Sequence, residues 1–373
     1  MTLSDRLKFF GIALDASDDP KKSTLKQNHA LGALPWKLMF PNPYKGLISY
    51  LKDVLNLNFC DEAGEIMVDS WLTPTPKVED LPLVEPENYN TFITSDCCSD
   101  YANLVKRFVA DKVLPDKPAM VAVDHSMTGG ALKALAEHFG PENIAVLVFD
   151  NHFDGIRAKD RMELSRYAKD HPSELLNFET VSSSDMFSDV PETYNCATFL
   201  RYLLDEDVIL PGNLMIIGVA DYPPEEAERD EHLKKYSKAY LHYEDKGITF
   251  ITKHDVDAGG RNISGRMDSF FRKVAAPHIY ISLDADVGSF KSVYAARTMN
   301  AIGLSRKQLH GLASAVSQQI VHYKKTLVGF DVCEVDTYLA GYEFEPGVKD
   351  KTYEVLSDLV RMILKQPTLQ EQV

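Results

Sequence analysis

The sequence contains no long hydrophobic run. None of its apolar stretches approaches the roughly 20 residues that a helix needs to cross a bilayer. The N-terminal residues include Asp5, Arg6 and Lys8 and lack the apolar core of a secretory signal. We therefore expect no membrane partner, and the sequence predicts a cytoplasmic protein.

Positive charge is also scarce. The 373-residue chain has 40 Lys and Arg residues against 55 Asp and Glu residues, which gives a formal net charge of −15. Nucleic acids and anionic membrane surfaces are bound through basic patches, so neither is an expected partner. The 45% hydrophobic and 25% charged residues are typical of a globular protein. Composition therefore favours an ordinary enzyme that acts on a small-molecule substrate.

Paired cysteines are absent as well. The five cysteines of the chain are Cys60, Cys97, Cys98, Cys196 and Cys333. No two of them have the Cys-x-x-Cys spacing on which structural zinc sites are built. An odd number of thiols without a framework spacing fits a reducing cytosol better than an extracellular, disulfide-stabilised protein.

The sequence instead contains apolar runs that end in acids or histidine. The most informative run covers residues 144–149 and leads into the motif Asp-Asn-His-Phe-Asp at 150–154. Apolar runs rich in β-branched residues are typical of strands buried on both faces. Alternate side chains of an extended segment share one side, so Asp150, His152 and Asp154 would repel or desolvate one another there unless a cation joined them. For this motif alone, a polar loop is the alternative.

Three further runs end in the same way, far apart in the sequence. They are residues 119–123 before Asp124 and His125, residues 279–283 before Asp284 and Asp286, and residues 327–330 before the acids at 331, 334 and 336. The carboxyl ends of parallel strands meet at one edge of a sheet, where α/β folds build their sites. One shared site at such an edge explains all four runs.

Strands and helices are predicted to alternate along the chain. Strands are expected near 9–14, 119–123, 144–149, 214–219, 248–252, 279–283 and 327–332, and helices near 131–139, 306–323 and 350–365. Ser305 and Gln308 have the spacing of a capping box, which predicts the start of the second helix. The first hundred residues are expected to form one strand, wrapping loops and short helices.

The four elements resemble those of the ureohydrolase superfamily, which includes arginase, agmatinase and formiminoglutamase. They read Val-Asp-His-Ser at 123–126, Asp-Asn-His-Phe-Asp at 150–154, Ser-Leu-Asp-Ala-Asp at 282–286 and Glu334, in the family's order. The resemblance covers about residues 119–336. It implies a three-layer α/β/α fold with a central, mainly parallel sheet, formed by one domain over residues 1–373 in which residues 1–118 wrap the metal-site core at 119–336.

The resemblance also implies two manganese ions per chain. One ion would be bound by His125, Asp150, Asp154 and Asp284, and the other by Asp150, His152, Asp284 and Asp286. Such a set of oxygen donors with two imidazoles suits Mn²⁺, and two dications would lower the pKa of a shared water. Glu334 would accept hydrogen bonds from the nitrogens of an amidine-type substrate, and Asp154 would pass a proton to the leaving nitrogen.

Departures from the family pattern bear on the substrate. Cys196 stands where arginases and agmatinases have a proton-shuttle histidine, and Ile156 stands where arginases have an asparagine that binds the amino acid. The segments at 198–201 and 213–219 look like the formiminoglutamase branch. The resemblance therefore implies hydrolysis of a linear C–N bond in a formimino or guanidino compound rather than in arginine.

Two arginines and one long interval complete the expected site. Arg157 and Arg297 are candidates to bind a substrate carboxylate, because a guanidinium can bind one bidentately. The alternative is that both are plain surface arginines. Residues 155–195 are charged and mixed, which is compatible with a lid over the site.

Other functions remain as alternatives. One is an agmatinase or guanidino-acid hydrolase. Another is a metal-binding member of the fold that has lost turnover, because the family's histidine and its two glycines before Asp124 are missing. A third is a deacetylase with a single zinc on a related fold, which the six ligands disfavour because one metal does not need both His125 and Asp286. The sequence also leaves a homo-oligomer open.

Overall fold

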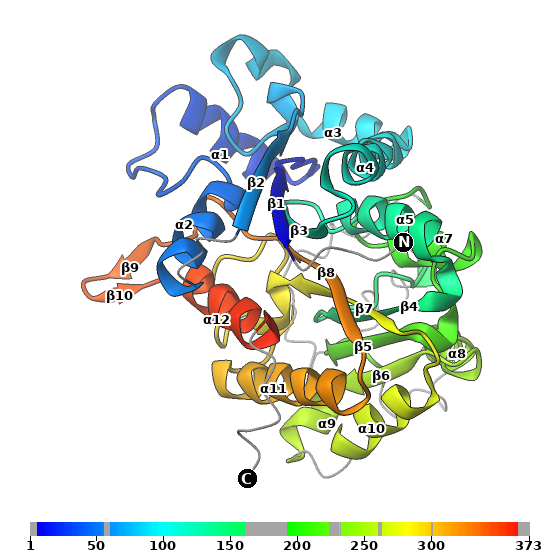
Figure 1. Cartoon of the computed structure of the whole chain (residues 1–373). Helices are drawn as coiled ribbons and strands as arrows, with labels where there is room; N and C mark the ends of the chain where they lie inside the picture. Colours follow the sequence, from blue (N-terminus) through cyan, green and yellow to red (C-terminus); the bar gives the residue numbers. More distant parts are fainter. Residues whose placement is uncertain are drawn as a thin grey trace.

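The computed structural model describes residues 6–55, 60–157, 159–160, 192–223, 231, 233–259, 263–299 and 301–364. Its main strands are β1 (Leu7–Ile12), β2 (Cys60–Ile66), β3 (Lys117–Ala122), β4 (Ile144–Phe149), β5 (Leu214–Val219), β6 (Thr249–Thr252), β7 (His278–Asp284) and β8 (Thr326–Cys333). They form one eight-stranded sheet in the order β2-β1-β3-β8-β7-β4-β5-β6 (Figure 1). Every neighbouring pair in it is parallel.

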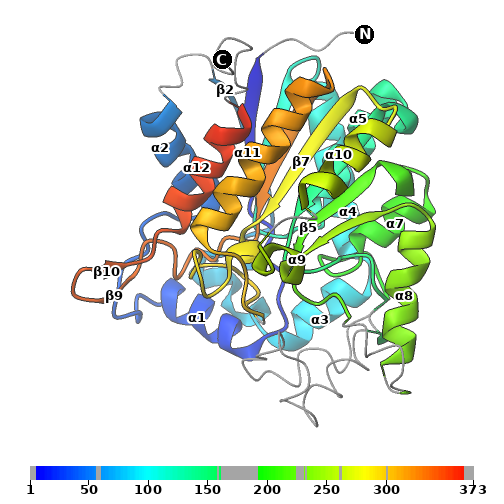
Figure 2. The same ribbon diagram turned by 90° about the horizontal axis from the view of Figure 1, so that it is seen from below.

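Helices cover both faces of this sheet, as Figures 1 and 2 show. On one face lie α3 (Pro86–Thr94), α4 (Cys97–Phe108), α5 (Met127–Phe139), α7 (Phe199–Asp205) and α8 (Lys234–Asp245). On the other lie α2 (Pro43–Leu55), α9 (Lys253–Asp257), α10 (Ile263–Lys273), α11 (Arg306–His322) and α12 (Thr352–Leu364). This arrangement confirms the predicted three-layer α/β/α fold.

The apolar runs supply the two cores between these layers. Every residue of β4 and of β5 is buried, as expected for strands with helices on both sides. Side chains alternate between the layers: Val146 and Val148 pack in one core, whereas Leu147 and Phe149 pack in the other. The fold therefore follows from the period-two placement of large apolar residues on buried strands.

Smaller elements lie around the sheet. Helix α1 (Pro20–Ala30) follows β1 and lies near the edge at which the strands end (Figure 2). Strands β9 (Glu343–Glu345) and β10 (Val348–Lys349) form a separate antiparallel pair. None of the helices in the described ranges combines the length and the apolar composition needed to cross a membrane.

Strand β2 was not predicted. Its sequence is Cys-Asp-Glu-Ala-Gly-Glu-Ile, which has neither an apolar run nor a regular alternation. It is the outermost strand of the sheet and pairs with β1 alone, so it needs no side chains that bury both of its faces. The expectation of a single strand in the first hundred residues was therefore wrong.

Helix α5 starts earlier than the predicted helix at 131–139, which Gly129 and Gly130 precede in the sequence. The helix begins at Met127 and includes both glycines. A Cβ atom on Gly130 would lie 2.1 Å from the backbone oxygen of Ala102 in α4, so a glycine is needed for close packing of the two helices. The predicted capping box of α11 is confirmed, since Ser305 and Gln308 each accept a hydrogen bond from the other's backbone.

Candidate metal centre

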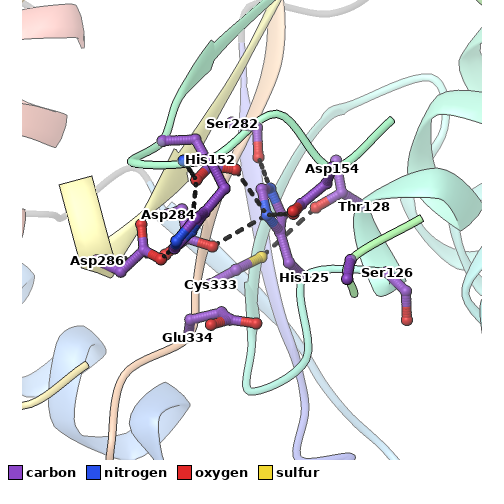
Figure 3. A network of polar contacts seen from close by, with 12 residues as sticks. His125, Ser126, Thr128, His152, Asp154, Ser282, Asp284, Asp286, Cys333 and Glu334 are labelled. Carbon is purple, nitrogen blue, oxygen red and sulfur yellow. Dashed lines mark hydrogen bonds and ion pairs between the residues drawn. The ribbon is translucent and has the colours of Figure 1, made fainter. Parts of the chain in front are cut away.

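The four central strands of the sheet bring the predicted motifs together. Strands β3, β8, β7 and β4 are neighbours, and their carboxyl ends share one edge. The side chains that gather there are His125 after β3, Asp150, His152 and Asp154 after β4, Asp284 and Asp286 at the end of β7, and Glu334 after β8. Figure 3 shows His125, His152, Asp154, Asp284, Asp286 and Glu334 among them. All seven residues are buried.

These side chains form overlapping groups in which the potential ligand atoms lie within 4.8 Å of one another. The groups are His125 with Asp150, Asp154 and Asp284, then Asp150 with His152 and Asp286, and then Asp284 with Asp286 and Glu334. The first contains the same four residues as one predicted ligand set. The second contains three residues of the other set, and Asp284 joins Asp286 in the third.

The two imidazoles contact different carboxylates and share Asp150. His125 Nδ1 lies 3.1 Å from Asp154 Oδ2, 3.0 Å from Asp284 Oδ2 and 3.4 Å from Asp150 Oδ2. His152 Nδ1 lies 2.8 Å from Asp286 Oδ2 and 3.7 Å from Asp150 Oδ1. Asp150 therefore lies between the two histidines.

Backbone hydrogen bonds orient the carboxylates at the strand ends. The amide of His152 donates to Asp150 Oδ1 over 2.6 Å, and the amide of Asp286 donates to Asp284 Oδ1 over 2.8 Å. Such contacts from a side chain to the backbone two residues on are typical of aspartates at turns. The amide of Asn151 also donates to Asp286 Oδ1, over 3.1 Å. Each acid thus keeps an oxygen for the centre of the cluster.

A second layer of polar side chains fixes the orientation of His125. Ser282 Oγ donates to Asp331 Oδ1 over 2.6 Å, and it lies 2.9 Å from His125 Nε2. Tyr280 donates to the other oxygen of Asp331 over 2.7 Å. Because the hydroxyl proton of Ser282 is used by Asp331, Ser282 accepts from His125 Nε2–H. Nδ1 is then the ring nitrogen that faces the carboxylates, and it could bind a metal ion on losing its proton.

Ser282 and Asp331 received no role in the prediction from sequence. The available signal was their position: both are polar residues inside apolar strands, where a buried polar side chain needs a partner.

Burial and neighbouring charges shift the pKa values of the acids in the cluster. Burial, together with the charges of neighbouring aspartates, raises the pKa of Asp150 and of Asp284 well above the ordinary value. Burial alone would raise the pKa of Asp286, but the charge and hydrogen bond of His152, together with the hydrogen bonds from the Asn151 amide and to Asp284, outweigh it and lower the pKa of that carboxyl. Asp150 Oδ2 is buried and has no hydrogen-bond partner among the described residues. Such a set of oxygens and imidazole nitrogens fits divalent cations of the Mn²⁺ type.

The two candidate arginines lie in different places. Arg157 is exposed, and its neighbours at 158 and 161–191 lie outside the described residues, as does most of the predicted lid at 155–195. Arg297 is only 9% exposed and lies beside Glu334, with Nη1 3.7 Å from Glu334 Oε1 and 2.8 Å from Asp124 Oδ2. Arg297 is therefore no plain surface residue, although its guanidinium is already paired.

Two departures from the family pattern also lie near the cluster. Burial, with the charges of Asp124 and Glu334, raises the pKa of the Cys196 thiol well above its ordinary value. The thiol therefore stays protonated at neutral pH and is a poor proton acceptor. Ile156 is 1% exposed and belongs to a hydrophobic core, so its position offers no polar group to a ligand.

Comparisons with known proteins agree with this architecture. A family model described as the arginase family matches residues 68–364. Proclavaminate amidinohydrolase from Streptomyces clavuligerus is 25% identical over 216 residues, which are 58% of this chain and 53% of that protein. The chain thus spans about half the length of this curated relative.

Solved structures show the same fold. An arginase from Bacillus caldovelox has a TM-score of 0.56 and 16% identity, with 98% of this chain and 100% of that chain covered. A formimidoylglutamase from Bacillus subtilis has a TM-score of 0.54 and 16% identity, with 98% and 88% covered.

Proposed function

The chain belongs to the arginase family, and from that premise we propose that it hydrolyses a linear C–N bond of a guanidino or amidino compound. The observation that carries the proposal is the buried cluster at the ends of β3, β4, β7 and β8, in which Glu334 lies within 4.8 Å of Asp284 and Asp286. An acceptor for a cationic group is thus placed directly beside a candidate site for divalent ions.

We propose that two divalent ions, Mn²⁺ by the nature of the donors, bind in this cluster. His125, Asp150, Asp154 and Asp284 would hold one ion, and Asp150, His152, Asp284 and Asp286 the other. When bound, the ions would supply a nucleophile at neutral pH by lowering the pKa of water.

Glu334 is the residue that would orient the substrate. Burial raises the pKa of its carboxyl to about 7, with Asp286 and Asp124 adding to the effect and Arg297 opposing it. A planar N–C–N cation placed against the Glu334 carboxylate would favour the ionised form of that carboxylate. Charge-assisted hydrogen bonds from the cation to Glu334 would then fix the orientation of the substrate. The trigonal carbon of the substrate would then face the aspartates of β4 and β7.

We assign proton transfer to Asp154, whose carboxylate would take up a proton released by the attacking water and pass it to the leaving nitrogen. Its Oδ2 atom lies 3.1 Å from His125 Nδ1, and the residue is 6% exposed. Cys196 stands where related enzymes have a histidine, and its protonated thiol is a poor shuttle. A carboxylate already in the cluster is the better candidate.

We propose that the preferred substrate is a formimino acid, or a guanidino acid other than arginine. Cys196 and the buried Ile156 support this choice, because neither offers the polar group that arginases use at these positions. Agmatinase-type activity and a metal-binding protein without turnover are the alternatives. The absence of a histidine at position 196 is the observation that favours the second alternative.

An activity screen of the manganese-loaded protein tests these proposals. Release of formamide, urea or ammonia is measured for formimino acids, guanidino acids, agmatine and arginine. We expect turnover of a formimino or guanidino acid and little with arginine. Efficient, arginine-selective release of urea would contradict the choice of substrate. No turnover of any compound by a protein with two bound ions would favour the non-catalytic alternative.

A further inference from the structure

Glu334 is held in an unusual backbone conformation. Its φ of 61° lies in the left-handed region, which residues other than glycine rarely adopt. Such a conformation persists only where the surrounding structure imposes it, and it is frequent at functional sites. Here the amide of Glu334 donates to the carbonyl of Val123 over 3.1 Å, and its carbonyl accepts from the amide of Arg297 over 2.7 Å. The backbone of Arg297 thus fixes one side of the strained residue.

The side chain of Arg297 holds the same glutamate. Its Nη1 atom lies 3.7 Å from Glu334 Oε1 and donates to Asp124 Oδ2 over 2.8 Å. Its Nε atom lies 3.2 Å from Asp15 Oδ1, and Nη2 donates to the carbonyl of Ala16. A guanidinium has five N–H donors, and all three nitrogens of this one already have partners within the chain. It presents no free pair of donors to a substrate carboxylate.

The partners of Arg297 are themselves fixed. Asp15 Oδ2 lies 3.1 Å from Lys26 Nζ, which is 1% exposed, and Lys22 Nζ donates to the carbonyl of Arg297 over 2.6 Å. Asp124 Oδ1 accepts from the amide of Ser126 over 3.0 Å. Lys26 thus pairs with one carboxylate partner of Arg297, and Lys22 holds the backbone of Arg297 itself.

The far side of Arg297 is closed to a substrate. Asp15, Pro74, Val123 and Tyr338 line a pocket beside Arg297 with about 10 Å³ of room, roughly the space for one water molecule. A carboxylate does not fit in that volume, so this pocket cannot bring a substrate carboxylate to the guanidinium.

We infer that Arg297 is a positioning residue that acts through Glu334: its backbone and its guanidinium together hold the glutamate carboxylate where an amidine cation can be bound. This inference rests on the proposed role of Glu334 as the acceptor of an amidine cation. It replaces the expectation that Arg297 binds the carboxylate of the substrate.

A double-mutant cycle on the manganese-loaded protein tests the inference. The variants are Arg297→Met, Glu334→Gln and the double variant, and the probe is acetamidinium, a planar N–C–N cation that has no carboxylate. Calorimetry measures its affinity without any need for turnover. We expect each single change to weaken binding by about tenfold or more, and the double variant to bind no more weakly than Glu334→Gln, because residues that act through one another are not additive.

Kinetics and controls separate positioning from a general structural role. In Arg297→Met we expect KM for the substrate to rise about tenfold with kcat within about threefold, since a uniform binding interaction is lost. Arg297→Lys should recover part of the affinity, because it keeps the charge. Arg306→Met is the matched control: Arg306 on α11 pairs with Glu354 and Asp358 on α12, and neither acid belongs to the cluster, so acetamidinium affinity should not change.

The outcomes distinguish this inference from the proposed function. Additive losses in the double variant, or full acetamidinium affinity in Arg297→Met, would overturn the role of Arg297 and leave the hydrolase intact. A wild-type protein that does not bind acetamidinium would also overturn it. If the double-mutant cycle gives the expected non-additive losses but no amidine is hydrolysed, the role of Arg297 stands and the proposed hydrolysis is contradicted. If Arg297→Met does not fold, the cycle is run with Arg297→Lys, for which a smaller, non-additive loss is expected.

Discussion

At the residue scale, Asp286 links the segment after β4 to the end of β7 within the candidate metal centre. One of its oxygens accepts from the amide of Asn151, and the other lies 2.8 Å from His152 Nδ1. The carboxylate of β7 thus orients a loop that follows β4. Asparagine at this position would keep an acceptor for the amide while removing the negative charge that a metal ligand needs.

Asp286→Asn should therefore lower the metal content from two ions per chain towards one, with the fold retained. The ligand supports one ion, whereas the buried strand on which it stands supports the core. Elemental analysis after Mn²⁺ loading measures the change, and circular dichroism checks the fold. Asp257→Asn, which affects a partly exposed ion pair with Lys253 on α9, is the control that should keep both ions. Two fully occupied ions in Asp286→Asn would contradict the assignment.

The residues of the cluster could be predicted because they stand next to each other in short motifs at strand ends. The residues that support them could not. Arg297 contacts Asp124 and Asp15, which lie 173 and 282 positions earlier in the chain, so no local pattern connects them. Asp331 was visible as an acid at a strand end, but its role depends on Tyr280 and Ser282 in the neighbouring strand.

At the scale of elements, α5 owes its close approach to α4 to a glycine. A Cβ atom at Gly130 would meet the backbone oxygen of Ala102 at 2.1 Å and Val105 Cβ at 2.7 Å. A backbone atom cannot move aside as the end of a flexible side chain can. The helix that begins directly after His125 is thus held against its neighbour by the absence of a side chain.

Gly130→Ala should destabilise the protein by about 1–3 kcal/mol, the usual cost of overpacking a tight contact. Urea unfolding measures the change in free energy of unfolding. Gly311→Ala in α11 is the matched control, because nothing lies within 4 Å of the position that a Cβ atom would take there. An alanine at 311 should stabilise by about 0.4–1 kcal/mol through the lower entropy of the unfolded chain. Equal effects of the two changes would contradict the packing argument.

The elements predicted most accurately from the sequence are the strands that have both faces buried under helices. Strands β4 and β5 match their predicted bounds because each is a continuous apolar run between polar segments. Strand β2 was not predicted, because an edge strand with one partner requires no continuous apolar run. The first turn of α5 was not predicted, because a glycine pair is locally typical of a loop. Only the packing of α5 against α4 shows why a glycine is needed in this helix.

At the scale of the whole molecule, the family model begins at residue 68, but the sheet does not. Strand β1 lies between β2 and β3, and the segment after it supplies Asp15 and Lys26 to the network around Arg297. The described residues before that start, 6–55 and 60–67, are therefore part of the fold and of the surroundings of the site. The expected cytoplasmic location and a homo-oligomer stay predictions.

The charge of the cluster makes the stability of the metal-free protein depend on pH. The pKa values of Asp150 and Asp284 are raised by burial and by neighbouring aspartates, so the folded protein binds more protons than the unfolded chain above pH 3.8. Glu334, raised by burial from 4.5 to about 7, acts in the same direction. Stability is then lost as pH rises through this interval. Asp286, whose pKa is lowered by His152 against the effect of burial, opposes the trend.

Mn²⁺ should therefore raise the melting temperature more at about pH 7.5 than at about pH 5, because ionised carboxylates are what the ions stabilise. At a free concentration of about 100 times its Kd, each ion adds about 2.7 kcal/mol. Differential scanning fluorimetry of the metal-free and loaded protein at both pH values measures the shift. The Asp286→Asn variant should show a smaller shift. A larger stabilisation at the lower pH would contradict the proposed ligands.

The order of the strands also has a consequence for synthesis. Strand β8 lies in the middle of the sheet, between β3 and β7, yet it is the last of the eight strands to leave the ribosome. Until residue 333 has emerged, the sheet can exist only as two halves, β2-β1-β3 and β7-β4-β5-β6, each with an unpaired inner edge. His125 belongs to one half and the aspartates to the other. The nascent chain thus cannot bring together the residues of the proposed metal centre before its last central strand joins the two halves.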